Sequence, residues 1–89
     1  MELIKTAIQK LSDNNIAAID LHAHRIKELV VSNENHPLMD ENDELAYNST
    51  KASLRGYLRC LVDAGTLNLD EYLEIYFYVK AGKKLEDLR

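Results

Sequence analysis

Apolar residues recur every three or four positions along most of this 89-residue chain. The clearest example begins after Asn15, where a narrow apolar seam follows a 3-4-3-4 rhythm through Ile16, Ile19, Ala23, Ile26 and Val30. Side chains at this spacing lie on one face of an α-helix, so the pattern predicts a helix over residues 15–33. The same spacing predicts a shorter helix over residues 2–11, with an apolar face formed by Ile4, Ala7, Ile8 and Leu11.

Two further helices are predicted by their apolar faces and their end signals. A helix over residues 42–64 presents one face formed by Tyr47, Leu54, Leu58 and Leu61. Gly65 follows it as a left-handed C-terminal cap. The stretch NLDE, residues 68–71, matches a capping box and predicts a fourth helix over residues 69–81, stopped by Gly82. The KKLEDLR stretch that follows either extends this helix or frays.

The segment NENHPLMDEND separates the second and third helices, because His36-Pro37 disfavours helix and Asp40 or Asn42 can cap the next one. With one proline and three glycines, the chain has few other helix breakers. We therefore expect an all-α fold: a single domain, built as a small helical bundle. Its two long helices form an antiparallel hairpin, and the two shorter ones pack against it.

Two helices carry more packing surface than one short chain can cover. The apolar residues of helix 69–81 occupy more than half of its circumference. Helix 42–64 has, opposite its leucines, a face of small side chains: Ser49, Ala52, Ser53, Gly56 and Cys60. Glycine inside a helix costs about 1 kcal/mol relative to alanine, so Gly56 favours close approach of another backbone. We expect a homo-oligomer; the alternative is an exposed small face.

Composition and charge restrict the function classes. With 46% hydrophobic and 29% charged residues, the composition is that of an ordinary globular protein. No apolar run is long enough for a membrane span, and MELIKTAIQK does not have the pattern of a signal peptide, so a cytoplasmic location is expected. A net charge of -4 argues against a nucleic acid polymer as partner. The single cysteine, Cys60, excludes an intramolecular disulfide and is expected to be a small buried side chain.

The stretch IDLHAH, residues 19–24, copies an Asp-x-His-x-His metal motif. In metal enzymes that string lies on a β-strand, where side chains two positions apart share a face. On a helix, residues two apart diverge by about 200°, so His22 and His24 cannot bind one ion together. We expect no metal or other cofactor, a surface pair between Asp20 and His24, and His22 at the edge of a packed face. The serines lack a nucleophile context and no phosphate-binding glycine loop is present, so an enzyme is not predicted.

A cationic stripe is the main candidate for function. Lys51, Arg55 and Arg59 follow one another at four-residue intervals, and only Arg59 has an acid within helical reach, Asp63. Arginine binds phosphate through two parallel hydrogen bonds, and a tyrosine ring can stack on a base. The predicted ligand-binding residues are therefore these three cations with Tyr47, and Arg25 and His22 from the neighbouring helix. The alternative is an ordinary solvated face, where cationic side chains cover apolar edges.

This outline of about 90 residues, all helical, acidic, and with a local cationic and tyrosine patch, resembles small phage counter-defence proteins. In size and layout it is most similar to the anti-CBASS cyclic-nucleotide sponges. The resemblance implies a compact helical oligomer that sequesters cyclic di- and trinucleotides without cleaving them, using a stacking tyrosine and basic residues between subunits, in the host cytoplasm. It is a resemblance of outline, and no individual residue role is carried over from that family.

Two functional hypotheses follow. The first is a non-enzymatic, homo-oligomeric binding protein that captures a small phosphorylated ligand, such as a cyclic oligonucleotide. The second is a protein-interaction module, an inhibitor or adaptor, that docks the wide apolar face of helix 69–81 on a larger partner. Sequence-specific DNA binding through helix 42–64 is disfavoured by the net charge and by the lack of a helix-turn-helix spacing signal.

Overall fold

The computed structural model describes residues 2–35 and 38–89, and in this part of the chain it contains helices and no strand. In chain order they are α1 (Glu2–Gln9), α2 (Asp13–Ser32), α3 (Glu41–Asp63) and α4 (Leu69–Lys80), followed by a short 3-10 helix, η1 (Leu85–Leu88). The predicted all-α class is confirmed, and the observed bounds differ from the predicted ones by two residues or fewer. The predicted break at His36-Pro37 lies outside the described residues.

Capping side chains mark where α2, α3 and α4 begin. Ser12 and Asn15 form a capping box at the start of α2, and Asn68 and Glu71 form the predicted one at the start of α4. At the start of α3 the cap is Asp40, whose carboxylate accepts a hydrogen bond from the Asn42 amide. In each case a side-chain oxygen satisfies an amide that has no partner within its helix.

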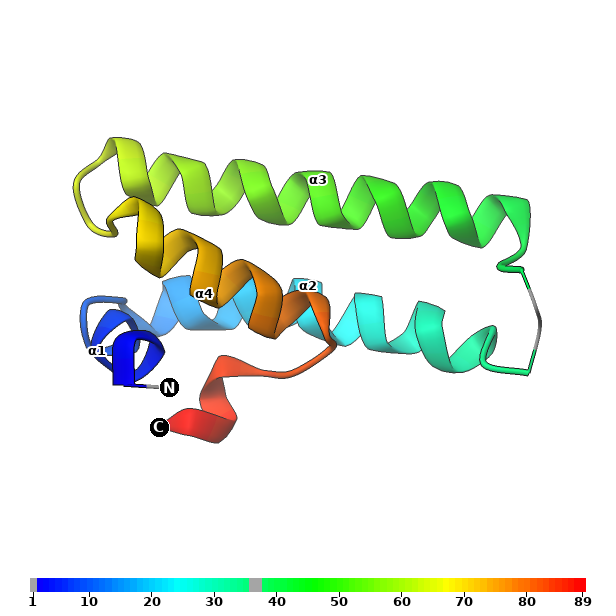
Figure 1. The fold of residues 1–89 in the computed structure, drawn as a ribbon, viewed down its shortest axis with the longest axis horizontal. Helices are drawn as coiled ribbons and strands as arrows, with labels where there is room; N and C mark the ends of the chain where they lie inside the picture. Colours follow the sequence, from blue (N-terminus) through cyan, green and yellow to red (C-terminus); the bar gives the residue numbers. More distant parts are fainter. Residues whose placement is uncertain (1, 36–37) are drawn as a thin grey trace.

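The helices pack as two layers (Figure 1). α2 and α3 lie side by side along the long dimension of the molecule, which measures 39 × 24 × 21 Å. α4 lies against both of them, but only over the half nearest to α1. α1 packs on α4, and η1 packs on α2. The far ends of α2 and α3 therefore extend beyond the second layer.

The buried core follows this arrangement. Apolar side chains from all four helices and from η1 form one cluster, whose least exposed large members are Ile4, Ile19, Ile26, Leu54, Leu58, Ile75, Val79 and Leu85. Two expectations were wrong. Val30 continues the predicted seam but is 46% exposed, because α4 and η1 do not reach that end of α2. Cys60 is exposed, because it lies on the face of α3 that no described part of the chain covers.

A buried ion pair joins α4 to the segment after α1. The Glu71 side chain is almost fully buried, and its carboxylate lies 2.8 Å from Nζ of Lys10, which is partly exposed. The same carboxylate accepts the Asn68 amide of the capping box. Burial alone raises the pKa of Glu71, but the hydrogen bonds from Lys10 and Asn68, with the charge of Lys10, outweigh burial and lower this pKa.

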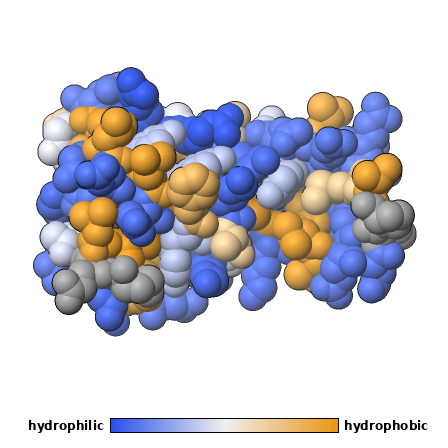
Figure 2. Space-filling view, in the orientation of Figure 1, coloured by the Kyte–Doolittle hydropathy of each residue, from blue (hydrophilic) through white to orange (hydrophobic). Residues whose placement is uncertain are grey.

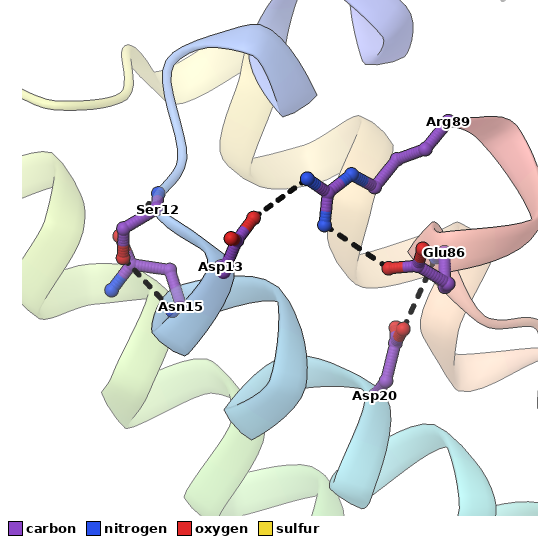
Figure 3. A network of polar contacts seen from close by, with 6 residues as sticks. All are labelled: Ser12, Asp13, Asn15, Asp20, Glu86 and Arg89. Atoms are coloured by element: carbon purple, nitrogen blue, oxygen red, sulfur yellow. Dashed lines mark hydrogen bonds and ion pairs between the residues drawn. The ribbon is translucent and has the colours of Figure 1, made fainter.

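The C-terminal stretch neither extends α4 nor frays, contrary to expectation. After Gly82, which has a φ of 82°, the chain turns back and η1 packs on α2 with Leu85 fully buried. Asp20 of α2 accepts hydrogen bonds from the backbone amides of Leu85 and Glu86 at 2.7 and 3.1 Å. Arg89 bridges Asp13 and Glu86, and these contacts raise the pKa of Arg89 (Figure 3).

A polar contact holds the far ends of α2 and α3 together. The buried Asn33 side chain donates hydrogen bonds to the Leu29 carbonyl and to the Asp43 carboxylate, at 2.8 and 2.9 Å. Its oxygen accepts the Asp40 amide at 3.1 Å. One residue thus ties the end of α2 to the connecting segment and to the first turn of α3. Among the described helices, none is both long and apolar enough to span a bilayer.

Candidate anion-binding site

The six predicted ligand-binding residues lie in separate places on the structure. His22 and Arg25 line a hollow between α2 and α3, and Tyr47 and Lys51 line a second hollow near the start of α3. Arg55 lies against α4, and Arg59 lies near the end of α3. The neighbouring helix was expected to bring Arg25 close to Lys51. In the structure the two residues line separate hollows, which lie on different faces of α3.

The α2–α3 hollow has a volume of about 240 Å³ and combines one cation with several hydroxyl groups. From α2 it is lined by Leu21, His22 and Arg25, and from α3 by Ser49, Thr50 and Ser53. Steps of 100° per residue place Ser49 and Ser53 on one face of α3, one turn apart. Positive charge and hydroxyl donors are the groups that bind phosphate oxygens in proteins.

His22 connects the two walls of this hollow. One ring nitrogen, Nδ1, lies 2.7 Å from the Ala18 carbonyl oxygen, and the other, Nε2, lies 3.0 Å from the Ser53 hydroxyl. A carbonyl only accepts, so Nδ1 carries a proton. In the neutral ring, Nε2 then accepts from Ser53. The sequence placed His22 at the edge of a packed face, and its partial burial agrees with that position.

Arg25 has an exposed side chain, and it forms no ion pair with any residue that the structure describes. Thr50, by contrast, is already engaged, because its hydroxyl donates to the Ala46 carbonyl at 2.7 Å. The groups free to donate to a new anion are therefore the Arg25 guanidinium and the Ser49 hydroxyl, because the Ser53 hydroxyl donates to the neutral His22 ring. Serines 49 and 53 were noted in the sequence only as small residues, and Thr50 was not singled out.

The second hollow, of about 450 Å³, is lined by more acidic than basic side chains. Lys51 places its Nζ 4.2 Å from the centre of the Tyr47 ring, so this tyrosine already holds a cation of its own chain. Glu41 and Glu44 line the same hollow, so its acidic groups outnumber its single lysine. A phosphate would meet two carboxylates here, which makes this hollow the poorer site for an anion.

The remaining two cations of the stripe have partners within the chain. Arg55 donates from Nη1 to the Tyr76 hydroxyl at 3.1 Å, and its guanidinium carbon lies 5.8 Å from the centre of that ring. Arg59 pairs with Asp63 at 3.6 Å, and both side chains are exposed. A tyrosine leaves the charge of Arg55 uncompensated, whereas Asp63 offsets that of Arg59.

The small-residue face of α3 is open in the single chain. A Cβ added to Gly56 would meet nothing within 4 Å, so no described backbone approaches it closely. Ser49, Ala52, Ser53 and Cys60 on the same face are also exposed. The homo-oligomer expected from this face stays a prediction.

The IDLHAH stretch lies within α2, as its helical setting predicted. The expected Asp20–His24 pair was wrong: Asp20 binds the amides of η1, and His24 instead pairs with Glu28 at 2.6 Å. Two unpaired backbone amides of η1 are stronger partners for Asp20 than an exposed imidazole. In the part of the chain that the structure describes, no group of three or more His, Cys, Asp or Glu side chains is arranged to hold a metal ion.

Comparisons with known proteins give no assignment. No family model matches the chain, and no curated protein or solved structure is significantly similar to it. The candidate site therefore rests on the geometry and charge described above.

Proposed function

We propose that this protein is a non-enzymatic binding protein that captures a small phosphorylated ligand at the α2–α3 hollow. The proposal includes the finer architecture expected from the sequence, an antiparallel α2–α3 hairpin within a homo-oligomer. The ligand class is a cyclic oligonucleotide signal, and the biological role is that of a phage-type counter-defence sponge in the host cytoplasm.

One observation carries the proposal: in a chain of net charge -4, Arg25 lies beside a hollow with hydroxyl donors and has no acidic partner among the described residues. The arginine fork and the Ser49 hydroxyl can together donate to the oxygens of one phosphate. Ser53 becomes a further donor when the His22 ring is protonated, because its hydroxyl then accepts from Nε2 and can donate to the ligand.

The size of the hollow limits how much of the ligand it holds. Pockets for drug-sized ligands are about 300–1,000 Å³. At about 240 Å³, the α2–α3 hollow holds a phosphate group with part of its sugar, and the rest of the ligand lies outside it. The bases would lie over the exposed face of α3 or against a second subunit, as expected for a ligand held between copies.

Calorimetry against a panel of cyclic di- and trinucleotides tests this function. We expect binding by the wild-type chain and at least about a tenfold loss of affinity in Arg25→Ala, because a charged hydrogen-bonding group contributes roughly 1.5 to 3 kcal/mol. Arg59→Ala is the matched control, since its guanidinium is paired with Asp63 and lies outside the hollow. No heat at tens of micromolar ligand, or equal affinities of both variants, would refute the proposal.

A second candidate function has its own observation. Leu69, Leu73 and Phe77 of α4 are 57%, 44% and 61% exposed, which leaves an apolar strip on the surface. This strip favours the protein-interaction hypothesis, in which an inhibitor or adaptor docks α4 on a larger partner. The two functions are distinguished by the calorimetry above, because a docking module has no affinity for cyclic nucleotides.

A further inference from the structure

The exposed apolar side chains of α4 form one continuous strip. Leu69, Leu73 and Phe77 are spaced by four residues, so they lie above one another on the same face of the helix. Each keeps 44% or more of its surface exposed although the opposite face of α4, including Ile75 and Val79, is fully buried. Figure 2 shows apolar patches over the end of the molecule where α4 and α1 lie, and others toward the far ends of α2 and α3. We name these three residues the α4 strip.

The two borders of the α4 strip carry opposite charge. Steps of 100° per residue place Asp70 and Glu74 along one border. Neither carboxylate pairs with another group among the described residues. The other border is formed by Tyr76, whose hydroxyl accepts from Arg55 of α3. Arg55 has no carboxylate partner in the described chain, so both borders present uncompensated charge.

We propose that a second copy of this chain covers the α4 strip, with the two α4 helices side by side and parallel. The charges of the two borders favour this orientation. A twofold axis parallel to the helices sets the Glu74 border of each copy against the Arg55 border of the other, and symmetry repeats the contact. An antiparallel pair would instead set Glu74 against the partner's Glu74, and Arg55 against the partner's Arg55. Opposite charges across an interface fix its register and exclude the repulsive one.

The apolar contact in this dimer is small. Three side chains per copy are far fewer than the 20 to 30 residues per side of a standard stable interface. The dimer therefore forms and dissociates with protein concentration. The residues of the α4 strip do not line the α2–α3 hollow, so this dimer contact lies apart from the proposed ligand site.

Sedimentation equilibrium on the whole chain, from about 10 µM to 1 mM, tests whether the dimer exists. We expect the average mass to rise toward twice that of the 10.2 kDa chain. Leu73→Glu places a charge at the centre of the strip, so we expect at least about a tenfold weaker association. Val31→Glu is the matched control, because Val31 is an exposed apolar residue of α2, away from the strip. A wild-type chain that stays monomeric throughout refutes the proposal, and a dimer weakened equally by both variants also refutes it.

Charge reversal and cross-linking test the orientation. In the parallel dimer Glu74→Arg and Arg55→Glu each weaken association, and the double variant restores it. In an antiparallel dimer each single variant would keep like charge against like, so neither would weaken association. In a Cys60→Ser background, Leu69→Cys and Leu73→Cys should each form a disulfide with the same residue of the second copy, because parallel helices bring both positions level. Self-linking at one of the two positions only would contradict the parallel arrangement.

Discussion

The single residues that contribute most to the stability of this fold are those whose polar groups are buried. Glu71 is the clearest case, since its carboxylate is almost fully buried and receives hydrogen bonds from Lys10 and from the Asn68 amide. Both contacts favour the charged form. The lowered pKa of Glu71 is the consequence, and it links the stability of the fold to pH.

We predict that Glu71 stabilises the fold at neutral pH and stops doing so in acid. A carboxyl group whose pKa is lower in the folded chain contributes stability above its unfolded value, near 4.5, and loses it as the pH falls through the folded value. Glu71→Gln should lower the free energy of unfolding by about 1 to 2 kcal/mol at pH 7, because a charge-assisted hydrogen bond is lost. Urea unfolding at pH 7 and pH 3 measures the difference.

The matched control is Glu74→Gln on the same helix, which is exposed and has no contact of this kind in the described structure. We expect it to change the free energy of unfolding by less than about 0.5 kcal/mol at either pH. A gap between wild type and Glu71→Gln that is as wide at pH 3 as at pH 7 would show that the contribution does not come from the ionised carboxylate.

At the residue scale, local signals could be predicted from the sequence and burial could not. The Asn68–Glu71 capping box was predictable because both partners lie within one turn and match a known pattern. Val30 and Cys60 were wrongly expected to be packed. Periodicity says which side of a helix is apolar, but it does not say how far the neighbouring helix extends along it. That distance depends on where α4 ends and η1 turns back.

Among the elements, η1 shows how a short segment is held by a distant helix. A 3-10 helix of four residues has little stability of its own, so its position depends on its tertiary contacts. Asp20 supplies two of these through its carboxylate, and buried Leu85 supplies the apolar contact. Arg89 adds exposed ion pairs to Asp13 and Glu86, which contribute less.

We predict that Asp20→Ala releases η1 from α2. The variant leaves the Leu85 and Glu86 amides without their acceptor, and loss of a side chain that caps a helix costs about 0.5 to 2 kcal/mol. Hydrogen exchange should show faster exchange at these two amides, and urea unfolding should show a corresponding loss of stability. Asp87→Ala is the control, because it removes an exposed carboxylate of η1 that accepts no hydrogen bond in the described structure. Unchanged exchange in Asp20→Ala would show that Leu85 alone anchors the segment.

The sequence could not predict these element contacts, because their partners lie far apart in the chain. Asp20 and Leu85 are 65 positions apart, and Arg55 and Tyr76 are 21 apart. The Arg59–Asp63 pair, in contrast, spans one helical turn and was anticipated. The candidate site could not be predicted for the same reason. Sequence spacing aligned three cations on α3, whereas the hollow with the unpaired Arg25 depends on which edge of α3 faces α2.

Across the whole molecule, packing is uneven along the α2–α3 pair. The half that lies against α4 contains nearly all of the fully buried apolar side chains. Beyond Ile26 on α2 and before Thr50 on α3, the only buried residue among those described is Asn33. Apolar side chains such as Val31, Leu38 and Leu45 are left exposed at this end. Hydrogen bonds therefore hold the far ends of α2 and α3 together more than apolar burial does.

We therefore predict that the far end opens without unfolding of the rest. Segments with few buried apolar contacts open locally at a lower free energy than the core. Backbone amides of residues 44–49 should exchange faster than those of residues 54–62, which include the fully buried Leu54 and Leu58. Hydrogen exchange followed by NMR or mass spectrometry measures both sets in one experiment.

Asn33→Ala gives a sharper test, because the variant loses the hydrogen bonds that join the end of α2 to Asp40 and to Asp43 of α3, with a third to the Leu29 carbonyl of α2 itself. A loss of about 1.4 kcal/mol in the local opening free energy corresponds to a tenfold faster exchange, so residues 44–49 should exchange roughly tenfold faster or more. Residues 54–62 should be unaffected, since they exchange only when the core opens. Asn35→Ala, at an exposed neighbouring position, should change neither set. Equal acceleration of both sets by Asn33→Ala would mean that the two ends unfold together, and the α2–α3 hollow, lined by Arg25 and Ser49, would then share the stability of the core.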